Sequence, residues 1–242
     1  MLISYHNDPK LKESIVSEMC KHQKQDQFIK GTYAKMNGKF KGCAVGCAID
    51  SFNIKLGKSY DKNNHKAFEE AIGVPEYLAR VQDTIFEGLP EKENSKFAVD
   101  FLAAIPVGVN LYPVKWKFCA FILKENIERT LTLKYISDEL KEKVVNSIRQ
   151  CLKLHEDAIE TGKWDESAAV SAASAARSAA WSVESAASAA RSAAWSVESA
   201  ARSAASAAWS VERAARSAAS AARSAKYQRY AKELLRILEQ TV

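Results

Sequence analysis

Two cysteines in the run KGCAVGC, Cys43 and Cys47, are the first residues whose spacing indicates chemistry. They stand four residues apart, on one face of an expected helix, and could bind a metal together with His22 and His65. Zinc requires four nitrogen or sulfur ligands in tetrahedral array, but no second cysteine pair follows. Cysteines in an Ala-, Val- and Gly-rich helix are more often small core residues. We therefore expect reduced thiols and no bound metal.

Cys43 alone could act as a nucleophile. It lies at the expected start of a helix, where the helix dipole lowers the pKa of a thiol. His22 could serve as its base and Asp26 could orient His22, so the residue types of a cysteine-dependent hydrolase or transferase are present. In the alternative interpretation, His22 and Asp26 only satisfy each other across one helical turn.

The same segment could bind an anion without transforming it. Gly42 and Gly46 would let a ligand approach the backbone at a helix N-terminus, where free N–H groups favour phosphate. Residues close in sequence could add positive charge and ring stacking: Lys30, Tyr33, Lys39 and Lys41. In the alternative interpretation, the two glycines only permit close packing of the helix.

A further charged group follows at Arg80, Asp83 and Glu87. Their spacing places the three side chains on one face of a helix expected over residues 76–86. Opposite charges at such spacing usually form solvated ion pairs. We therefore interpret the group as a surface ion-pair row.

The elements that position these residues are mostly helices. Asp8 and Pro9 are typical of a helix start, and this helix should run to about Lys30 with His22 and Asp26 on its inward side. Residues 32–41 predict a hairpin with a type I′ turn at Asn37-Gly38. Further helices are expected over 42–52, 76–86, 95–104, 113–129 and 137–160. The prediction is a mainly α fold, with a small helical front domain over residues 1–164 and one minor hairpin.

Residues 165–242 are dominated by a strict repeat of the phrase SAAx. Trp181, Trp195 and Trp209 recur every two heptads, and rows of Ala and Val alternate three and four residues apart. This pattern is that of a left-handed coiled coil. We predict a long Ala-rich heptad-repeat helix with an amphipathic C-terminal end, whose Ala169–Ala225 seam joins copies into a homo-oligomer. In the alternative, the long helix packs on the front domain of its own chain. The tryptophans would either close over the edge of that interface or form an exposed ladder.

Charge and cysteine usage limit the functional classes. The net charge of +6 is divided evenly between the two parts, which is consistent with an anionic small ligand but too weak to indicate nucleic-acid binding. The first residues, MLISYHNDPK, lack the apolar core of a signal peptide, and no apolar run is long enough to span a bilayer. Five scattered cysteines fit a reducing compartment. We expect a cytoplasmic protein without membrane partners.

Four motifs resemble a family of uncharacterised proteins from bacteriophages and mobile elements of gut bacteria. These motifs are YHNDPK (Tyr5–Lys10), KGTY (Lys30–Tyr33), KGCAVGC (Lys41–Cys47) and GVPEYLARVQDTIFEGLP (Gly73–Pro90). Members have such a front domain followed by an Ala-rich tail of variable repeats, and the tail is also similar to Ala-rich "putative immunity" proteins. The resemblance implies no reaction and no catalytic residues. It implies a phage context, in which small cytoplasmic proteins often act on host machinery and host defence.

The leading hypothesis is a non-enzymatic binding protein without a cofactor. It would be a phage counter-defence factor that captures a nucleotide-like signal or blocks a host protein. Its predicted ligand-binding residues are Tyr33, Lys39, Lys41, Gly42, Cys43 and Gly46. The first alternative is the cysteine-dependent enzyme that uses Cys43, His22 and Asp26. The second alternative is a structural protein that serves oligomerisation.

Overall fold

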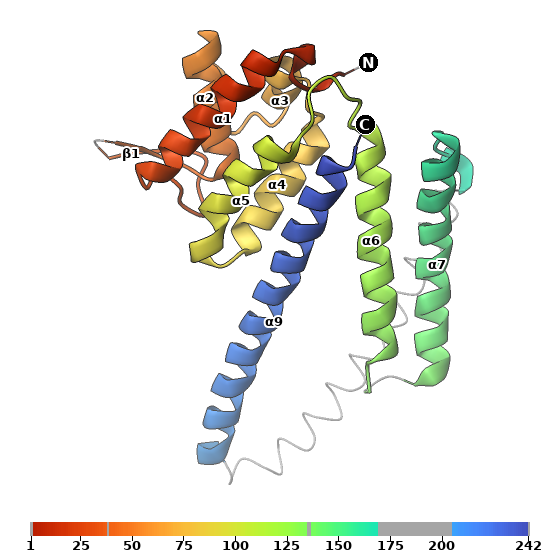
Figure 1. Cartoon of the computed structure of the whole chain (residues 1–242). Helices are drawn as coiled ribbons and strands as arrows, with labels where there is room; N and C mark the ends of the chain where they lie inside the picture. The colour runs from red at the N-terminus through yellow and green to blue at the C-terminus, as the bar shows by residue number, and fades with distance from the viewer. Residues whose placement is uncertain (1, 38, 135–136, 169–204, 242) are drawn as a thin grey trace. The chain divides into compact units, whose positions relative to one another are not determined.

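The computed structural model describes residues 2–37, 39–134, 137–168 and 205–241 (Figure 1). These residues are mainly helical with one short pair of strands, which confirms the predicted fold class. The chain forms two compact units: unit 1 comprises Met1–Lys115 and Ala221–Val242, and unit 2 comprises Trp116–Ser220. The predicted boundary between residues 164 and 165 coincides with neither junction, because the last turns of the chain belong to the same unit as the first.

The core of unit 1 is built by α1 (Pro9–Lys24), α2 (Ala44–Leu56), α4 (Glu76–Gly88) and α5 (Glu91–Ala104). Helices α1 and α4 each pack against both α2 and α5, and the short α3 (Ala67–Ile72) packs against α2 and α4. Full burial of an aromatic side chain stabilises a fold by about 1.5–3 kcal/mol. The largest fully buried aromatic side chains are Tyr5, Phe52, Phe68, Phe86 and Phe101.

Helix α1 begins as predicted but ends earlier. Asp8 caps its start by accepting a hydrogen bond from the Lys10 amide at 2.8 Å. The helix ends at Lys24 because Asp26 adopts a left-handed conformation (φ 53°), which no α-helix can continue through. The predicted extension to residue 30 is therefore wrong. The Asp26 side chain is 93% exposed, so its predicted inward position is also wrong, whereas His22 is buried as predicted.

Residues 25–34, the connecting segment, lead from α1 to the predicted hairpin. Backbone hydrogen bonds tie the segment to Gly42, two residues before α2: the Ile29 amide donates to the Gly42 carbonyl at 2.9 Å, and the Gly42 amide donates to the Gln27 carbonyl at 2.9 Å. The hairpin consists of β1 (Lys35–Asn37) and β2 (Lys39–Lys41), paired antiparallel. Its turn includes residue 38, which lies outside the described residues, as does the predicted turn type.

Two elements of unit 1 are absent from the sequence prediction. One is α3, whose six residues are too few to show helical periodicity. The other is η1 (Ser4–Asn7), in which Tyr5, His6 and Asn7 all have positive φ angles of 50–62°. Side-chain hydrogen bonds hold this unusual turn, with Tyr5 Oη donating to the Leu102 carbonyl at 2.6 Å. Such tertiary contacts supply the energy that a left-handed turn of non-glycine residues requires.

The end of α9 (Ala205–Glu239) packs within unit 1. Its inward side chains are buried, and Gln228 donates a hydrogen bond to Glu93 at 2.5 Å. The Tyr227 ring lies over Gly88, where any Cβ would come within 2.1 Å of the ring. The buried residues of this segment are Tyr230, Ala231, Leu234, Ile237, Leu238 and Thr241. The last turns therefore have a packing partner inside the chain.

Most of the predicted repeat helix, together with Trp181 and Trp195, lies in residues 169–204, outside the described residues. The predicted oligomer seam falls largely there too. Residues 205–225 are helical, in agreement with the helix predicted for that part.

Unit 2 contains most of α6 (Tyr112–Leu131) and all of α7 (Asp138–Thr161). Ser137 caps α7 by accepting from the Leu140 amide, and an ion pair between Lys124 and Glu156 (2.9 Å) joins the two helices. Both helices lie close to their predicted ranges. Among the helices that the structure describes, none combines the length and the apolar character needed to cross a membrane.

Candidate functional site

The start of α2 is packed against the connecting segment of the same chain. The carbonyl oxygen of Tyr33 occupies the space beside both glycines of the motif: a Cβ would lie 1.7 Å from it at Gly46 and 2.4 Å from it at Gly42. The Cys43 amide donates to the Thr32 carbonyl at 2.8 Å. The glycines thus permit close backbone packing, which was the alternative interpretation. Their predicted role in ligand approach is wrong, because the chain itself fills that space.

Cys43 is the N-cap of α2 rather than an activated nucleophile. Its sulfur accepts from the Gly46 amide at 3.5 Å, and the residue is 2% exposed. Burial, followed by the negative charge of Asp83, raises the pKa of the Cys43 thiol far above its ordinary value. The helix dipole therefore does not produce the low pKa that was predicted, since loss of water favours the neutral thiol.

The predicted catalytic triad is not assembled. His22 Nδ1 lies 2.6 Å from Gln27 Oε1, and Nε2 lies 3.6 Å from a carboxylate oxygen of Asp50. Asp26 pairs instead with Lys41, at 3.1 Å. The alternative, in which His22 and Asp26 satisfy each other, is wrong as well. Both interpretations depended on α1 continuing through Asp26, where it has already ended.

Asp83 and Glu87 lie near the thiol of Cys43, and together with His65, which contacts Asp83, these residues are termed here the cysteine cluster. The sulfur and one carboxylate oxygen each from Asp83 and Glu87 lie within 4.8 Å of one another. His65 is 7% exposed, and its Nε2 lies 3.7 Å from Asp83 Oδ2. The Tyr33 ring meets His65 edge-on, at 5.6 Å between ring centroids.

The predicted surface row of Arg80, Asp83 and Glu87 does not form. Arg80 pairs with Glu76, one turn earlier, at 2.5 Å. Glu87 accepts from the Gly31 amide at 3.0 Å, and Asp83 faces the cysteine cluster. The spacing correctly placed the two carboxylates on one face of α4, but that face lies against α2 and the connecting segment.

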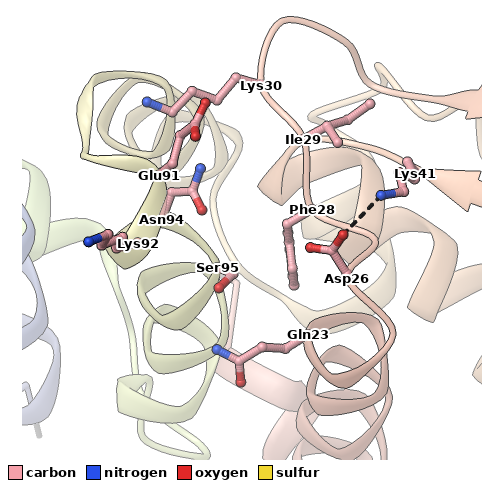
Figure 2. Close-up of a pocket in the computed structure, with 10 residues that line it drawn as sticks. All are labelled: Gln23, Asp26, Phe28, Ile29, Lys30, Lys41, Glu91, Lys92, Asn94 and Ser95. Carbon is pink, nitrogen blue, oxygen red and sulfur yellow. Dashed lines mark hydrogen bonds and ion pairs between the residues drawn. The ribbon is translucent and has the colours of Figure 1, made fainter.

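A cavity of about 440 Å³ lies on the other side of the connecting segment, between it and the first turns of α5 (Figure 2). This is within the range of small-molecule sites, about 300–1,000 Å³. Its lining, termed here the lysine cavity, includes the lysines Lys30, Lys41 and Lys92 and the acidic residues Asp26 and Glu91, and the amine of Lys30 donates a hydrogen bond to the Leu89 carbonyl. Phe28 and Ile29 supply apolar surface, and amide and hydroxyl groups come from Gln23, Asn94 and Ser95.

The lysine cavity favours negative charge. Three lysines and two acidic residues line it, and no side chain caps the start of α5, whose first turn contributes to the lining. An uncapped N-terminus adds partial positive charge and free N–H groups. The amine of Lys41 pairs only with the largely exposed Asp26, in an ion pair worth about 0–1 kcal/mol. A ligand anion can therefore replace Asp26 at small cost.

Of the six residues predicted to bind a ligand, only Lys41 lines the lysine cavity. Lys39 lies on β2, exposed and outside the lining. The other four lie together in the packed region beside the cysteine cluster: Tyr33, Gly42, Cys43 and Gly46. The contribution of Glu91, Asn94 and Ser95 was missed. No local signal marks them, since α5 approaches the connecting segment only through tertiary packing.

No family model matches the chain, and no curated protein or solved structure is similar to it.

Proposed function

We propose that this protein binds a small anionic ligand of the nucleotide class in the lysine cavity and releases it unchanged. The observation that carries the proposal is a cavity of about 440 Å³ that is lined by Lys30, Lys41 and the uncapped start of α5. A phosphate group suits the amines and the helix N-terminus. Glu91 and Asn94 can exchange hydrogen bonds with the hydroxyl or amino groups of a nucleoside.

Capture rather than turnover follows from the chemistry of the lining. Its residues include neither a cysteine nor a histidine, and the buried thiols of α2 have raised pKa values. A protonated amine stabilises the charge of a bound anion but has no lone pair with which to act as a nucleophile. In the phage context that the sequence motifs indicate, such capture would withdraw a nucleotide signal from host defence.

The first experiment is mass spectrometry of the small molecules released when the pure protein is denatured. We expect a phosphorylated nucleoside. In a second experiment, the full chain is titrated separately with ADP, AMP and inorganic phosphate, and binding is measured by calorimetry. Lys41→Gln should weaken nucleotide binding about tenfold, which corresponds to about 1.4 kcal/mol.

Lys39→Gln is the matched control, because Lys39 lies on the same strand, carries the same charge and does not line the cavity. Its affinity should equal that of the unchanged protein. Equal losses in both variants would mean that only the overall charge attracts the ligand. Absence of nucleotide binding in the unchanged protein would refute the proposal and favour the blocking of a host protein.

A further inference from the structure

The cysteine cluster brings donor atoms from separate elements to one point. Cys43 lies at the start of α2, Asp83 and Glu87 lie one turn apart on α4, and the sulfur and two oxygens are within 4.8 Å of one another. Tetrahedral coordination with bonds of 2.0–2.3 Å places ligand atoms about 3.5 Å apart. Side-chain rotation of about 1 Å therefore suffices to close these three groups around an ion.

His65 provides the independent observation that indicates a ligand. Its side chain is 7% exposed at the surface, and its Nδ1 lies 3.1 Å from the Asn63 carbonyl oxygen. Because a carbonyl oxygen can only accept, Nδ1 carries the proton and leaves Nε2 as the nitrogen available for coordination. Nε2 is directed at Asp83 Oδ2, 3.7 Å away, which is within the distance of an ion pair but beyond that of a hydrogen bond. An Nδ1–H to carbonyl hydrogen bond is the usual means of orienting a metal-binding histidine.

Asp83 interacts with the side chains of Tyr33 and Cys43, but one of its two carboxylate oxygens lacks a partner within the described part of the chain. Asp83 Oδ1 is buried without a hydrogen-bond partner among the described residues, although buried polar atoms normally have one. Arg80 is the nearest arginine along α4, but it pairs with Glu76. Glu87 is oriented by the Gly31 amide, as carboxylate ligands commonly are. A cation among these groups would supply the missing partner.

We propose that Cys43, His65, Asp83 and Glu87 form a site for a divalent transition-metal ion of the zinc class. One sulfur, one imidazole nitrogen and two carboxylate oxygens give the four ligands that zinc takes in closed sites. A thiolate and an imidazole disfavour magnesium and calcium, which prefer oxygen ligands. Binding joins the thiolate to the ion and releases the thiol proton to solvent, with no change of oxidation state. The ion would link α2, α4 and the loop that carries His65, independently of the lysine cavity.

The proposed site differs from the metal site that the spacing of Cys43 and Cys47 suggests, because Cys47 is not one of its ligands. The Cys47 thiol donates to the Gly42 carbonyl at 3.5 Å, on the side of α2 that faces the connecting segment. Cys47 is also fully buried and lies one turn further along the same helix. It is therefore a matched control for Cys43.

The test is a titration of the chelator-treated full chain with Co²⁺, followed by displacement with Zn²⁺. We expect one equivalent to bind, a sulfur-to-cobalt charge-transfer band, the visible absorption of tetrahedral cobalt, and release of about one proton. Cys43→Ser should abolish the charge-transfer band while keeping the helix cap, since serine is also a favourable N-cap. Cys47→Ser should retain the band. Asp83→Asn and His65→Gln should each lower the affinity at least tenfold, and Asp100→Asn on α5 should not change it.

Two results would overturn the proposal. One is the absence of a sulfur-to-cobalt band at millimolar Co²⁺, or a band that survives Cys43→Ser. The other is a nitrogen-15 NMR spectrum at neutral pH in which both ring nitrogens of His65 stay protonated while Zn²⁺ is added. His65 would then form a simple ion pair with Asp83, and the cluster would be a structural network.

Discussion

The two sides of the connecting segment use polar backbone in opposite ways. Toward α2, the Tyr33 carbonyl fills the space beside Gly42 and Gly46, and the amide groups at the helix start have partners in the chain. Toward α5, the segment borders a cavity where no side chain caps the helix start and the Lys41 amine pairs with a largely exposed carboxylate. Both sides have a helix N-terminus and nearby lysines. Of the two, the side toward α5 has the space for a small organic anion.

This difference shows what glycines at a helix start indicate. They indicate that another group approaches the backbone closely, but they do not indicate whether that group is a ligand or part of the same chain. In a phosphate-binding loop the approaching group is a ligand, whereas at α2 it is another part of the same backbone. Space and unsatisfied polar groups distinguish the two cases, and both are properties of tertiary structure.

The largest expected effect comes from adding a methyl group on the side of the connecting segment that packs against α2, termed here the closed side. Gly46→Ala places a Cβ where the Tyr33 carbonyl now lies, at a separation of 1.7 Å, so that backbone must move. We expect a loss of about 3 kcal/mol in the free energy of unfolding, the upper end of overpacking effects. Urea denaturation measures it. Gly42→Ala, with a separation of 2.4 Å, should lose less. An Ala variant at position 46 as stable as the unchanged protein would show that the closed side is open.

A larger side chain on the side of the connecting segment that faces α5, termed here the open side, should reduce ligand affinity and leave stability unchanged. Ser95→Phe projects a ring from α5 into the lysine cavity, where the space is empty of protein atoms. Stability should change by less than about 0.5 kcal/mol, while nucleotide affinity should fall at least about tenfold. Calorimetric titration with ADP, beside urea denaturation of the same sample, separates the two. A variant that unfolds would mean that the cavity is a packed part of the core.

The closed side should also make stability depend on pH. Because burial raises the pKa of Cys43 in the folded chain, the unfolded chain releases the thiol proton first, above about pH 8.5. The free energy of unfolding should therefore decrease as pH rises from 8.5 to 10, by at most about 1.4 kcal/mol per pH unit for this thiol. Cys43→Ser should make the decrease smaller in urea denaturation across this range. Cys20→Ser, at a half-buried cysteine on α1, should leave it unchanged; equal slopes in all three proteins would contradict the assignment.

The smallest expected effect is at Asp26, on the open side. Asp26→Asn keeps a residue type that tolerates the left-handed conformation but removes the carboxylate that pairs with Lys41. Stability should stay within about 0.5 kcal/mol, because the ion pair is largely exposed. Nucleotide affinity should rise two- to threefold, since the ligand no longer displaces a carboxylate. Reduced affinity in calorimetry would show that Asp26 itself contacts the ligand.

Local patterns predict much of this fold. Asp8 and Pro9 mark the start of α1, the hairpin follows its turn residues, and the ranges of α4, α6 and α7 agree with the structure to within a few residues. The sequence-based predictions fail where a single backbone angle or a tertiary contact determines the local structure. The left-handed Asp26 ends α1 early, and the left-handed turn of η1 is held by residues about one hundred positions away. Neither has a signal within its own stretch of sequence.

The candidate sites are less predictable than the elements. Asp83 and Glu87 share a face of α4 by spacing alone, but spacing does not reveal whether that face meets water or the thiol of Cys43. The lysine cavity joins Lys41 to the first turn of α5, fifty residues later. A site composed of side chains from distant elements becomes visible only when packing brings those elements together.

The return of Ala221–Val242 to unit 1 makes unit 2 an insertion within unit 1. A change in repeat number that keeps the reading frame would leave the residues that pack within unit 1 in the sequence. A shift of frame in the repeats would instead remove Leu234, Ile237 and Leu238, which are buried in unit 1, and leave an apolar surface exposed. The core of unit 1 therefore depends on the reading frame of a repeat that lies outside it.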